Sequence, residues 1–290
     1  MAARNGGPDF LYVGTSKAGS TWLFNALSIH PEAFLPSFKG LYYFDHHFDN
    51  GLDWYLAQFA GARHQKAVGE ISHSYLSSPP AAARIAELNP RMRLLVCLRE
   101  PVDRAFSDYL DLRKNGQYDG SFEEALDRFP RLLDRGRYAE HLERYLALFP
   151  REQIHVSLFD DLKTDAQAYA DDVFAFLGIE QLQLPPASLK SRMPAGRPRN
   201  VTVARAAKSV SRWAKDAGLN SLRSRVKRSV LIRQALYRPF ADERPTMDPS
   251  TRVELRRSFA TEVDRLDDIL GTSVSTRWGY RSVDPEKASP

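Results

Sequence analysis

Short apolar runs alternate along the chain with segments of helical periodicity. Four runs have the length and composition of buried strands: residues 10–13, 68–72, 94–98 and 154–158. Apolar residues recur at helical spacing in the segments between and after them, at 22–29, 81–88, 102–114, 121–129, 138–148 and 165–177. This alternation predicts an α/β fold, a doubly wound parallel sheet flanked by helices. A last long helix is expected at 249–270, with Trp278 and Tyr280 closing the fold.

The segment after the first expected strand has the composition of a phosphate-binding loop. Gly14 and Gly19 bracket it, and a helix is expected to follow directly. Backbone N–H groups at the start of a helix attract anions, so this position favours a phosphate. Lys17 adds a full positive charge, and Ser20 and Thr21 add hydroxyl donors.

The loop departs from the pattern that binds nucleoside triphosphates with a metal. That pattern places a lysine and then Ser or Thr directly after the second glycine, whereas Lys17 comes two residues before Gly19. The strand at 94–98 ends in Arg99, where a magnesium site needs an acidic residue. The sequence therefore predicts a phosphate ligand held by lysine, hydroxyl and amide groups, with no metal.

Five blocks, in this order along the chain, resemble the sulfotransferases that use 3′-phosphoadenosine 5′-phosphosulfate (PAPS). This family includes the heparan sulfate O-sulfotransferases and their bacterial relatives. The blocks are the loop at 10–23, Lys39-Gly40-Leu41-Tyr42-Tyr43-Phe44-Asp45 with the Gly-x-x-Trp-Tyr tail at 51–55, Gly69-Glu70-Ile71-Ser72-His73-Ser74-Tyr75-Leu76, the segment 94–109 with Arg99, Arg104 and Ser107, and a downstream block at 136–154. The resemblance implies the P-loop-like nucleotide-binding fold of that family, PAPS as cosubstrate, 3′-phosphoadenosine 5′-phosphate (PAP) as product, and no metal.

The resemblance also implies residue roles. Glu70 would be the general base, and burial at the end of its strand would raise its pKa; a structural ion pair is the other interpretation, and His73 is a competing base. Lys17 would stabilise the leaving 5′-phosphate, and Lys39 would lie over the transferring sulfonate or be an ordinary surface lysine. Arg99 and Ser107 would clamp the 3′-phosphate, because a guanidinium binds phosphate oxygens bidentately. The full set expected around the nucleotide is Lys17, Ala18, Gly19, Ser20, Thr21, Trp22, Arg99, Ser107 and Arg197.

The chain departs from the family pattern at three places. Gly40 follows the lysine where family members often have Glu, and Ser72 stands where many heparan-type members have Thr. The late Lys-Gly-Arg loop of those members has its nearest counterpart in Ala195-Gly196-Arg197. The glycan-recognising parts have no match, so the resemblance does not imply a heparan acceptor.

Length and composition indicate the kind of domain and the cellular location to expect. The 290 residues include one cysteine, Cys97, in an apolar run that favours a core position, and they allow a single domain over 1–290. Residues 1–8 lack the apolar core of a signal peptide, and no run approaches the roughly 20 apolar residues of a membrane span. We therefore expect a soluble, cytoplasmic protein.

The net charge of +5 is unevenly distributed. Residues 187–241 hold fourteen Lys or Arg and one acidic residue, a net +13, which leaves −8 for the remainder. We expect two basic helices here, in an insertion or cap over 186–243. It could cap the cosubstrate through Arg197 or Arg199, bind an anionic acceptor or a membrane surface, or present only solvated helix faces. Nucleic acid is not an expected partner, because no recognised binding module accompanies the charge.

The leading hypothesis is a PAPS-dependent sulfotransferase acting on a hydroxyl or amine of an unidentified glycan, lipid or other small molecule. The aromatic residues near Lys39 would stack on a sugar, line a lipid or phenol pocket, or belong to the core. A P-loop-type kinase acting on a small metabolite is one alternative. The other is a non-catalytic protein with a nucleotide-binding fold that engages anionic partners through the basic segment.

Overall fold

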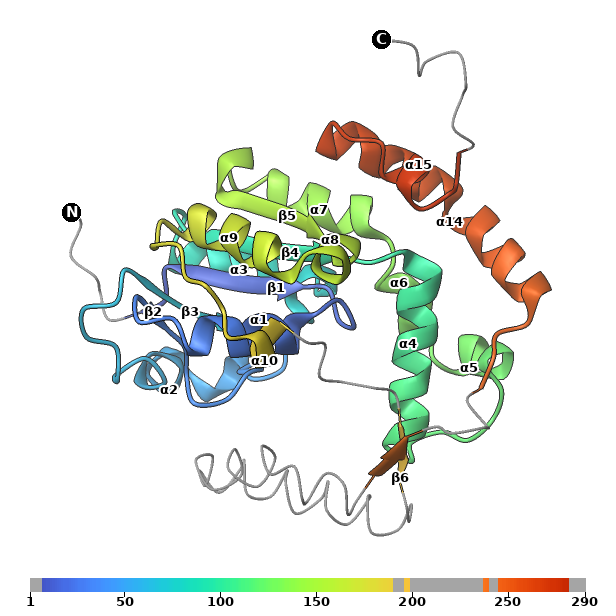
Figure 1. Cartoon of the computed structure of the whole chain (residues 1–290), viewed down its shortest axis with the longest axis horizontal. Helices are drawn as coiled ribbons and strands as arrows, with labels where there is room; N and C mark the ends of the chain where they lie inside the picture. Colours follow the sequence, from blue (N-terminus) through green and yellow to red (C-terminus); the bar gives the residue numbers. More distant parts are fainter. Residues whose placement is uncertain (1–6, 190–195, 199–236, 240–244, 282–290) are drawn as a thin grey trace.

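A parallel sheet forms the centre of the molecule. The computed structural model describes residues 7–189, 196–198, 237–239 and 245–281, with the side chains of 196–198 and 237–239 excluded. Five strands pair in the order β2-β3-β1-β4-β5, and every pair is parallel (Figure 1). Their bounds are β1 Phe10–Gly14, β2 Ala33–Phe34, β3 Ala67–Ile71, β4 Arg93–Leu98 and β5 Ile154–Leu158. The predicted α/β class with a parallel sheet is confirmed.

α-Helices connect the strands and follow the last strand of the sheet. They are α1 Ser20–Ser28, α2 Leu52–Ala57, α3 Ala81–Leu88, α4 Pro101–Lys114, α5 Phe122–Arg128, α6 Arg131–Asp134, α7 Tyr138–Leu146, α8 Phe159–Thr164, α9 Ala166–Leu177, α10 Pro186–Leu189, α14 Pro249–Leu270 and α15 Val274–Arg277. A capping box begins α5, where Ser121 and Glu124 satisfy each other's backbone N–H groups. Gly178 ends α9 in the left-handed conformation that glycine adopts without a Cβ penalty.

Alternate residues of the strands build two apolar layers. On one face, Phe10 and Tyr12 of β1 and Leu95 of β4 pack with residues of α1 and α9. On the other face, Leu11 and Val13 of β1 pack with residues of α3, α4, α7 and α14. Strands covered on both faces need no polar alternation, which explains why the sequence shows them as nearly continuous apolar runs.

The order of connections reverses the direction of winding next to β1. The chain leaves β1 through α1 toward β2 and β3 on one side, and later returns through β4 and β5 on the other. Ligands bind such sheets beyond the carboxyl ends of the strands, where the direction of winding reverses. The loop after β1 and the ends of β3 and β4 all lie there.

The structure contains several short elements that the sequence pattern does not predict, among them β2 and α8. The segment after α1 pairs with β3 as the short edge strand β2. Helix α8 precedes the predicted helix at 165–177, and Asp165 between them caps α9 by accepting from the backbone N–H groups of Gln167 and Ala168. Helix α8 is too short for its period to be recognised in the sequence.

The two helices expected in the basic segment lie outside the described residues. The described parts of that segment are α10 and the two-stranded antiparallel pair β6 (Gly196–Pro198) and β7 (Tyr237–Pro239), with β6 next to α4. The division into a body and a cap at 186–243 stays a prediction. In the described ranges, no helix has both the length and the apolar character to cross a membrane.

Candidate active site

The predicted phosphate loop joins β1 to α1 in the expected place. The Thr15 N–H donates to the Cys97 carbonyl at 3.0 Å, which ties the loop to β4, and the Tyr12 hydroxyl donates to the Thr15 carbonyl at 2.9 Å. Gly19, with φ +84°, directly precedes α1. Because glycine has no side chain, it cannot cap the first N–H groups of that helix. The first-turn N–H groups of α1 can therefore bind an anion at the positive end of the helix.

Lys39 reaches this loop from a segment nineteen residues away. Its Nζ donates to Ser20 Oγ at 2.9 Å and to Thr21 Oγ1 at 2.7 Å. The position agrees with the interpretation of Lys39 as a cation held at the site. The ammonium group and the two hydroxyls form one positively charged surface at the start of α1.

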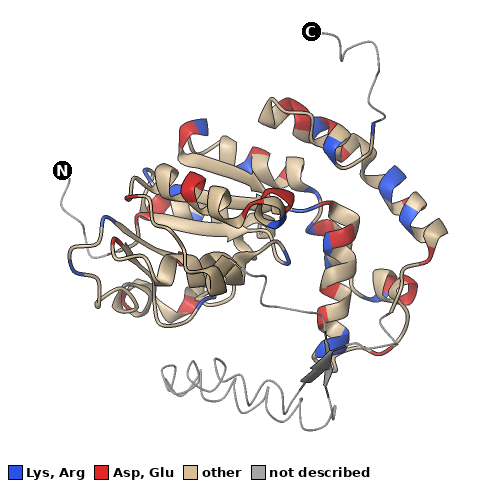
Figure 2. Ribbon diagram, in the orientation of Figure 1, with Lys and Arg blue, Asp and Glu red and all other residues tan. Residues whose placement is uncertain are grey.

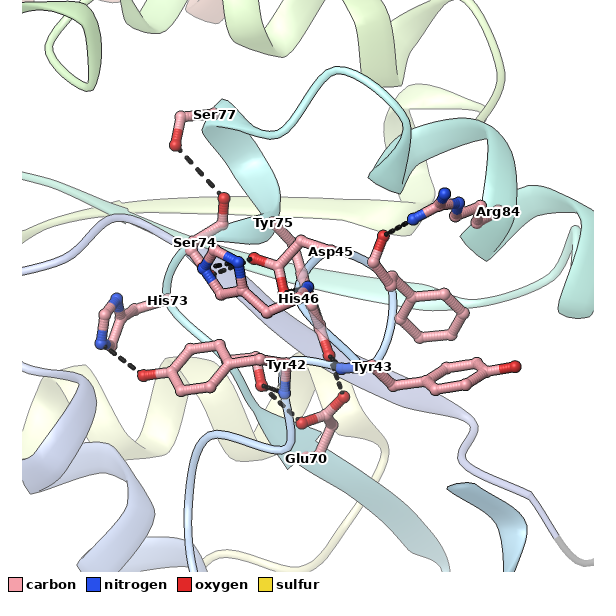
Figure 3. Close-up of polar contacts among 12 residues, drawn as sticks. Tyr42, Tyr43, Asp45, His46, Glu70, His73, Ser74, Tyr75, Ser77 and Arg84 are labelled. Carbon is pink, nitrogen blue, oxygen red and sulfur yellow. Dashed lines mark hydrogen bonds and ion pairs between the residues drawn. The ribbon is translucent and has the colours of Figure 1, made fainter. Parts of the chain in front are cut away.

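Glu70 lies at the carboxyl end of β3, beside β1, and its side chain is buried. Its Oε1 accepts from the Tyr75 hydroxyl at 2.7 Å (Figure 3). The same oxygen accepts from the Tyr55 hydroxyl at 3.2 Å, and Oε2 accepts from Ser72 Oγ at 2.6 Å. Burial raises the pKa of Glu70 from 4.5 to about 7, and the three hydroxyl donors and the Leu41 N–H oppose that rise. The expected upward shift is therefore confirmed.

The hydroxyls that hold Glu70 also hold the chain that carries Lys39. Ser72 Oγ accepts from the Tyr42 N–H at 3.1 Å, and the Tyr75 hydroxyl accepts from the Tyr43 N–H at 2.7 Å. The segments also meet through the backbone, where the Gly40 N–H donates to the Ile71 carbonyl at 2.9 Å. One connected set of hydrogen bonds therefore fixes Glu70 relative to the lysine segment.

His73, the competing base, has a different environment. Its Nε2 lies 2.7 Å from the Tyr42 hydroxyl, and its buried Nδ1 has no hydrogen-bond partner among the described residues (Figure 3). Burial, reinforced by the positive charge of Lys39, lowers the pKa of His73 to about 3. An imidazole with so low a pKa is a poor proton acceptor at neutral pH, which favours Glu70 as the base.

The charged side chains after β4 complete the site. The Arg99 Nη1 donates to the Lys17 carbonyl at 3.1 Å, and its guanidinium lies 5.1 Å from the centre of the Phe159 ring. Lys17 Nζ forms an ion pair with Asp111 of α4 at 3.2 Å. Ser107 lies on the same helix and is partly exposed. Arg197 falls in β6, where the side chains lie outside the described residues.

These residues fit an anionic nucleotide. The Ser16 hydroxyl in the loop is buried and bonds to no other described residue, so the loop retains an unused donor. In the described parts of the chain, no ion pair involves Arg99, and no group of three or more His, Cys, Asp or Glu is arranged to hold a metal ion. Sequence analysis did not identify Tyr55 as a hydrogen-bond donor to Glu70 or Asp111 as the ion-pair partner of Lys17. Neither residue stands near its partner in the sequence.

Comparison with known proteins identifies the family to which this chain belongs. Residues 7–193 match the model of the sulfotransferase domain. Human bifunctional heparan sulfate N-deacetylase/N-sulfotransferase 3 is 31% identical over 194 residues, with 59% of this chain and 22% of that protein covered. Human heparan sulfate glucosamine 3-O-sulfotransferase 5 is 30% identical over 186 residues, with 59% of this chain and 54% of that protein covered. The chain thus spans about half or less of the length of these relatives.

A solved structure matches over nearly the whole chain. The crystal structure of a sulfotransferase from Alicyclobacillus acidocaldarius superimposes with a TM-score of 0.70 and 26% sequence identity, covering 96% of this chain and 100% of that one. The family match takes in the phosphate loop, Lys39, Glu70, Arg99 and Ser107. On this evidence the chain belongs to the sulfotransferase domain family.

Proposed function

We propose that the protein transfers the sulfuryl group of PAPS to a hydroxyl or amine of an acceptor. PAPS supplies the group: its sulfur–oxygen bond to the 5′-phosphate breaks and releases PAP as a new bond forms from sulfur to the acceptor. The acceptor's proton passes to the Glu70 carboxylate. Atoms and charge balance without a metal or a redox partner.

Glu70 is the observation that carries the proposal. A carboxyl group with a pKa of about 7 can accept a proton near neutral pH and release it again. Its side chain is only 1% exposed, so an acceptor reaches it by displacing one of the three hydroxyl donors. The structural ion pair that is the other interpretation of Glu70 is not present within the described residues, where its hydrogen-bond donors are neutral.

The remaining side chains support the binding of a doubly phosphorylated nucleotide. The N–H groups of residues 18–22 would hold the 5′-phosphate, together with Ser20 and Thr21. Lys17 would stabilise the oxygen that leaves with that phosphate, and Lys39, 2.7–2.9 Å from the two hydroxyls, would stabilise charge on the sulfonate. Arg99 with Ser107 would bind the 3′-phosphate.

A binding and turnover experiment tests the proposal. PAP is expected to raise the melting temperature, and ATP with magnesium is not; the reverse result would favour the kinase. Labelled PAPS is then offered with a panel of glycans, glycolipids and phenols. Glu70→Gln should abolish transfer and leave PAP affinity within about twofold, since the substitution removes the base and keeps the shape. Normal transfer by this variant would reject Glu70 as the base.

We also propose a class of acceptor from the names of the relatives. Two of them are named for heparan sulfate, so a glycan is the first acceptor class to examine. Contact of the basic segment with a membrane surface and a cytoplasmic location are also proposals. Sedimentation with vesicles of anionic lipid and fractionation of cells would test them.

A further inference from the structure

The last described segment of the chain reaches the expected 3′-phosphate site. The family match ends at residue 193, and the segment 249–281 lies beyond it. We call α14, α15 and the residues up to Arg281 the C-terminal block. Helix α14 packs against α4 and α7, and α15 packs against α14 (Figure 1). The block therefore stands next to the turn between β4 and α4, which carries Arg99.

Three carboxylates lie within electrostatic range of the Arg99 guanidinium. They belong to Glu100 and Asp103 at the start of α4 and to Asp160 at the start of α8. Burial lowers the pKa of Arg99, and the negative charge of these three groups opposes that shift. Figure 2 shows acidic residues where α4 begins and basic residues along α14.

The C-terminal block binds each of the three carboxylates. The Tyr280 hydroxyl donates to Glu100 Oε1 at 2.6 Å, and the Trp278 Nε1–H donates to Asp160 Oδ2 at 3.0 Å. Arg252 Nη2 pairs with Asp103 Oδ1 at 2.9 Å. The two aromatic donors are separated from their acceptors by 118 and 180 positions in the sequence.

Both oxygens of two of these carboxylates are engaged by groups other than Arg99. The second oxygen of Glu100 accepts from the Asp103 N–H at 2.6 Å, and the second oxygen of Asp160 pairs with Lys163 Nζ at 2.5 Å. Arg99 itself forms no ion pair within the described residues, although three carboxylates are near. Its guanidinium instead contacts the Lys17 carbonyl and the Phe159 ring.

We propose that the C-terminal block positions Arg99 for the 3′-phosphate by occupying the carboxylates that would otherwise capture it. A carboxylate that lost its partner could rotate to the guanidinium and form a charge-assisted pair. The nucleotide would then have to break that pair before binding. The inference rests on the proposed function, because it concerns the phosphate that distinguishes PAP from 5′-AMP.

Titration calorimetry with PAP and with 5′-AMP tests the inference on the full-length chain. Tyr280→Phe and Trp278→Phe each remove one donor and retain an aromatic ring. Each is expected to weaken PAP binding about fivefold, the effect of one hydrogen bond, and the double variant more than about tenfold. Binding of 5′-AMP should change by less than about twofold, since it has no group for Arg99.

A second-site variant separates charge competition from loss of structure. Glu100→Gln keeps an oxygen that can accept from the Asp103 N–H but removes the charge. Added to Tyr280→Phe, it should restore PAP affinity to within about twofold of the original chain. Arg265→Gln, which breaks an exposed pair between α14 and Glu143 of α7, is the matched control and should leave both affinities unchanged.

Each outcome supports or overturns the inference. Three results would overturn the role of the block. They are an unchanged PAP affinity in the double variant, an equal loss of affinity for PAP and 5′-AMP, and no restoration of PAP affinity by Glu100→Gln. If the original chain itself binds PAP no better than 5′-AMP, the 3′-phosphate site fails and the inference fails with it. A loss confined to PAP and restored by Glu100→Gln would establish the role.

Discussion

Replacing Glu70 with glutamine should change how the stability of the protein depends on pH. Between pH 4.5 and about 7, the Glu70 carboxyl is ionised in the unfolded chain but still protonated in the folded one. The folded state therefore binds more protons, and the free energy of unfolding falls as pH rises through this interval. Above about pH 7 the folded protein carries the full cost of a buried carboxylate.

The size of the effect follows from the two pKa values. The difference between 4.5 and about 7 corresponds to a loss of about 3 kcal/mol between pH 4 and pH 8, an order-of-magnitude figure. The side chain is 1% exposed, so solvent screening does not reduce it. The amide introduced by Glu70→Gln has no charge to bury, and the variant should lack this pH-dependent loss.

Urea denaturation of both proteins, in steps from about pH 4.5 to about pH 8.5, measures the prediction. The amide NH₂ of the variant cannot accept hydrogen bonds from the hydroxyls as a carboxylate oxygen does. The free energies of unfolding of the two proteins will therefore also differ by a constant amount at every pH. The informative quantity is the stability of the variant minus that of the original chain, which should rise by about 3 kcal/mol across the series. Parallel curves would refute the raised pKa and, with it, the reason for assigning Glu70 as the base.

Three further substitutions test the other parts of the site. Lys39→Met should lower the rate of sulfuryl transfer at least about tenfold, an estimate for losing one charged group at the reacting centre, and a normal single-turnover rate would contradict its role. Arg99→Ala should weaken PAP binding more than about tenfold in calorimetry and leave 5′-AMP binding nearly unchanged; equal losses would place Arg99 elsewhere. Gly19→Ala should destabilise the fold by about 2 kcal/mol or more in urea, since Gly19 has φ +84° and a Cβ would lie 2.4 Å from Leu162 Cδ2; unchanged stability would show that the loop relaxes.

Local sequence predicted the framework of the site because its signals are local. The run 10–13, the glycine-bounded loop and the periodic segment after it encode a strand, a turn and a helix within a short stretch of chain. Arg99 and Glu70 each stand at the end of an apolar run, so their placement at strand ends needed only the strand itself. In a parallel sheet the carboxyl ends meet at one edge, and this brings such residues together without further information.

The environment of each group was decided by tertiary packing. Burial raises the pKa of Glu70, and hydrogen bonds from neighbouring groups oppose that rise. Two of these donors, Tyr75 and Tyr55, approach Glu70 from different segments. No periodicity encodes such a contact, since it depends on how α2 and the turn after β3 pack against the sheet. The contact between Lys39 and the hydroxyls of the phosphate loop arises in the same way.

The sequence by itself determined the fold class, the family and the position of the phosphate loop, because these follow from residue order and spacing. For Trp278 and Tyr280 it indicated only a role in closing the fold. The tertiary structure decided that these two side chains bind carboxylates next to Arg99, at positions 118 and 180 residues earlier in the chain. Such pairings depend on the packing of α14 against α4 and α7, which brings distant charges together and which no local pattern records.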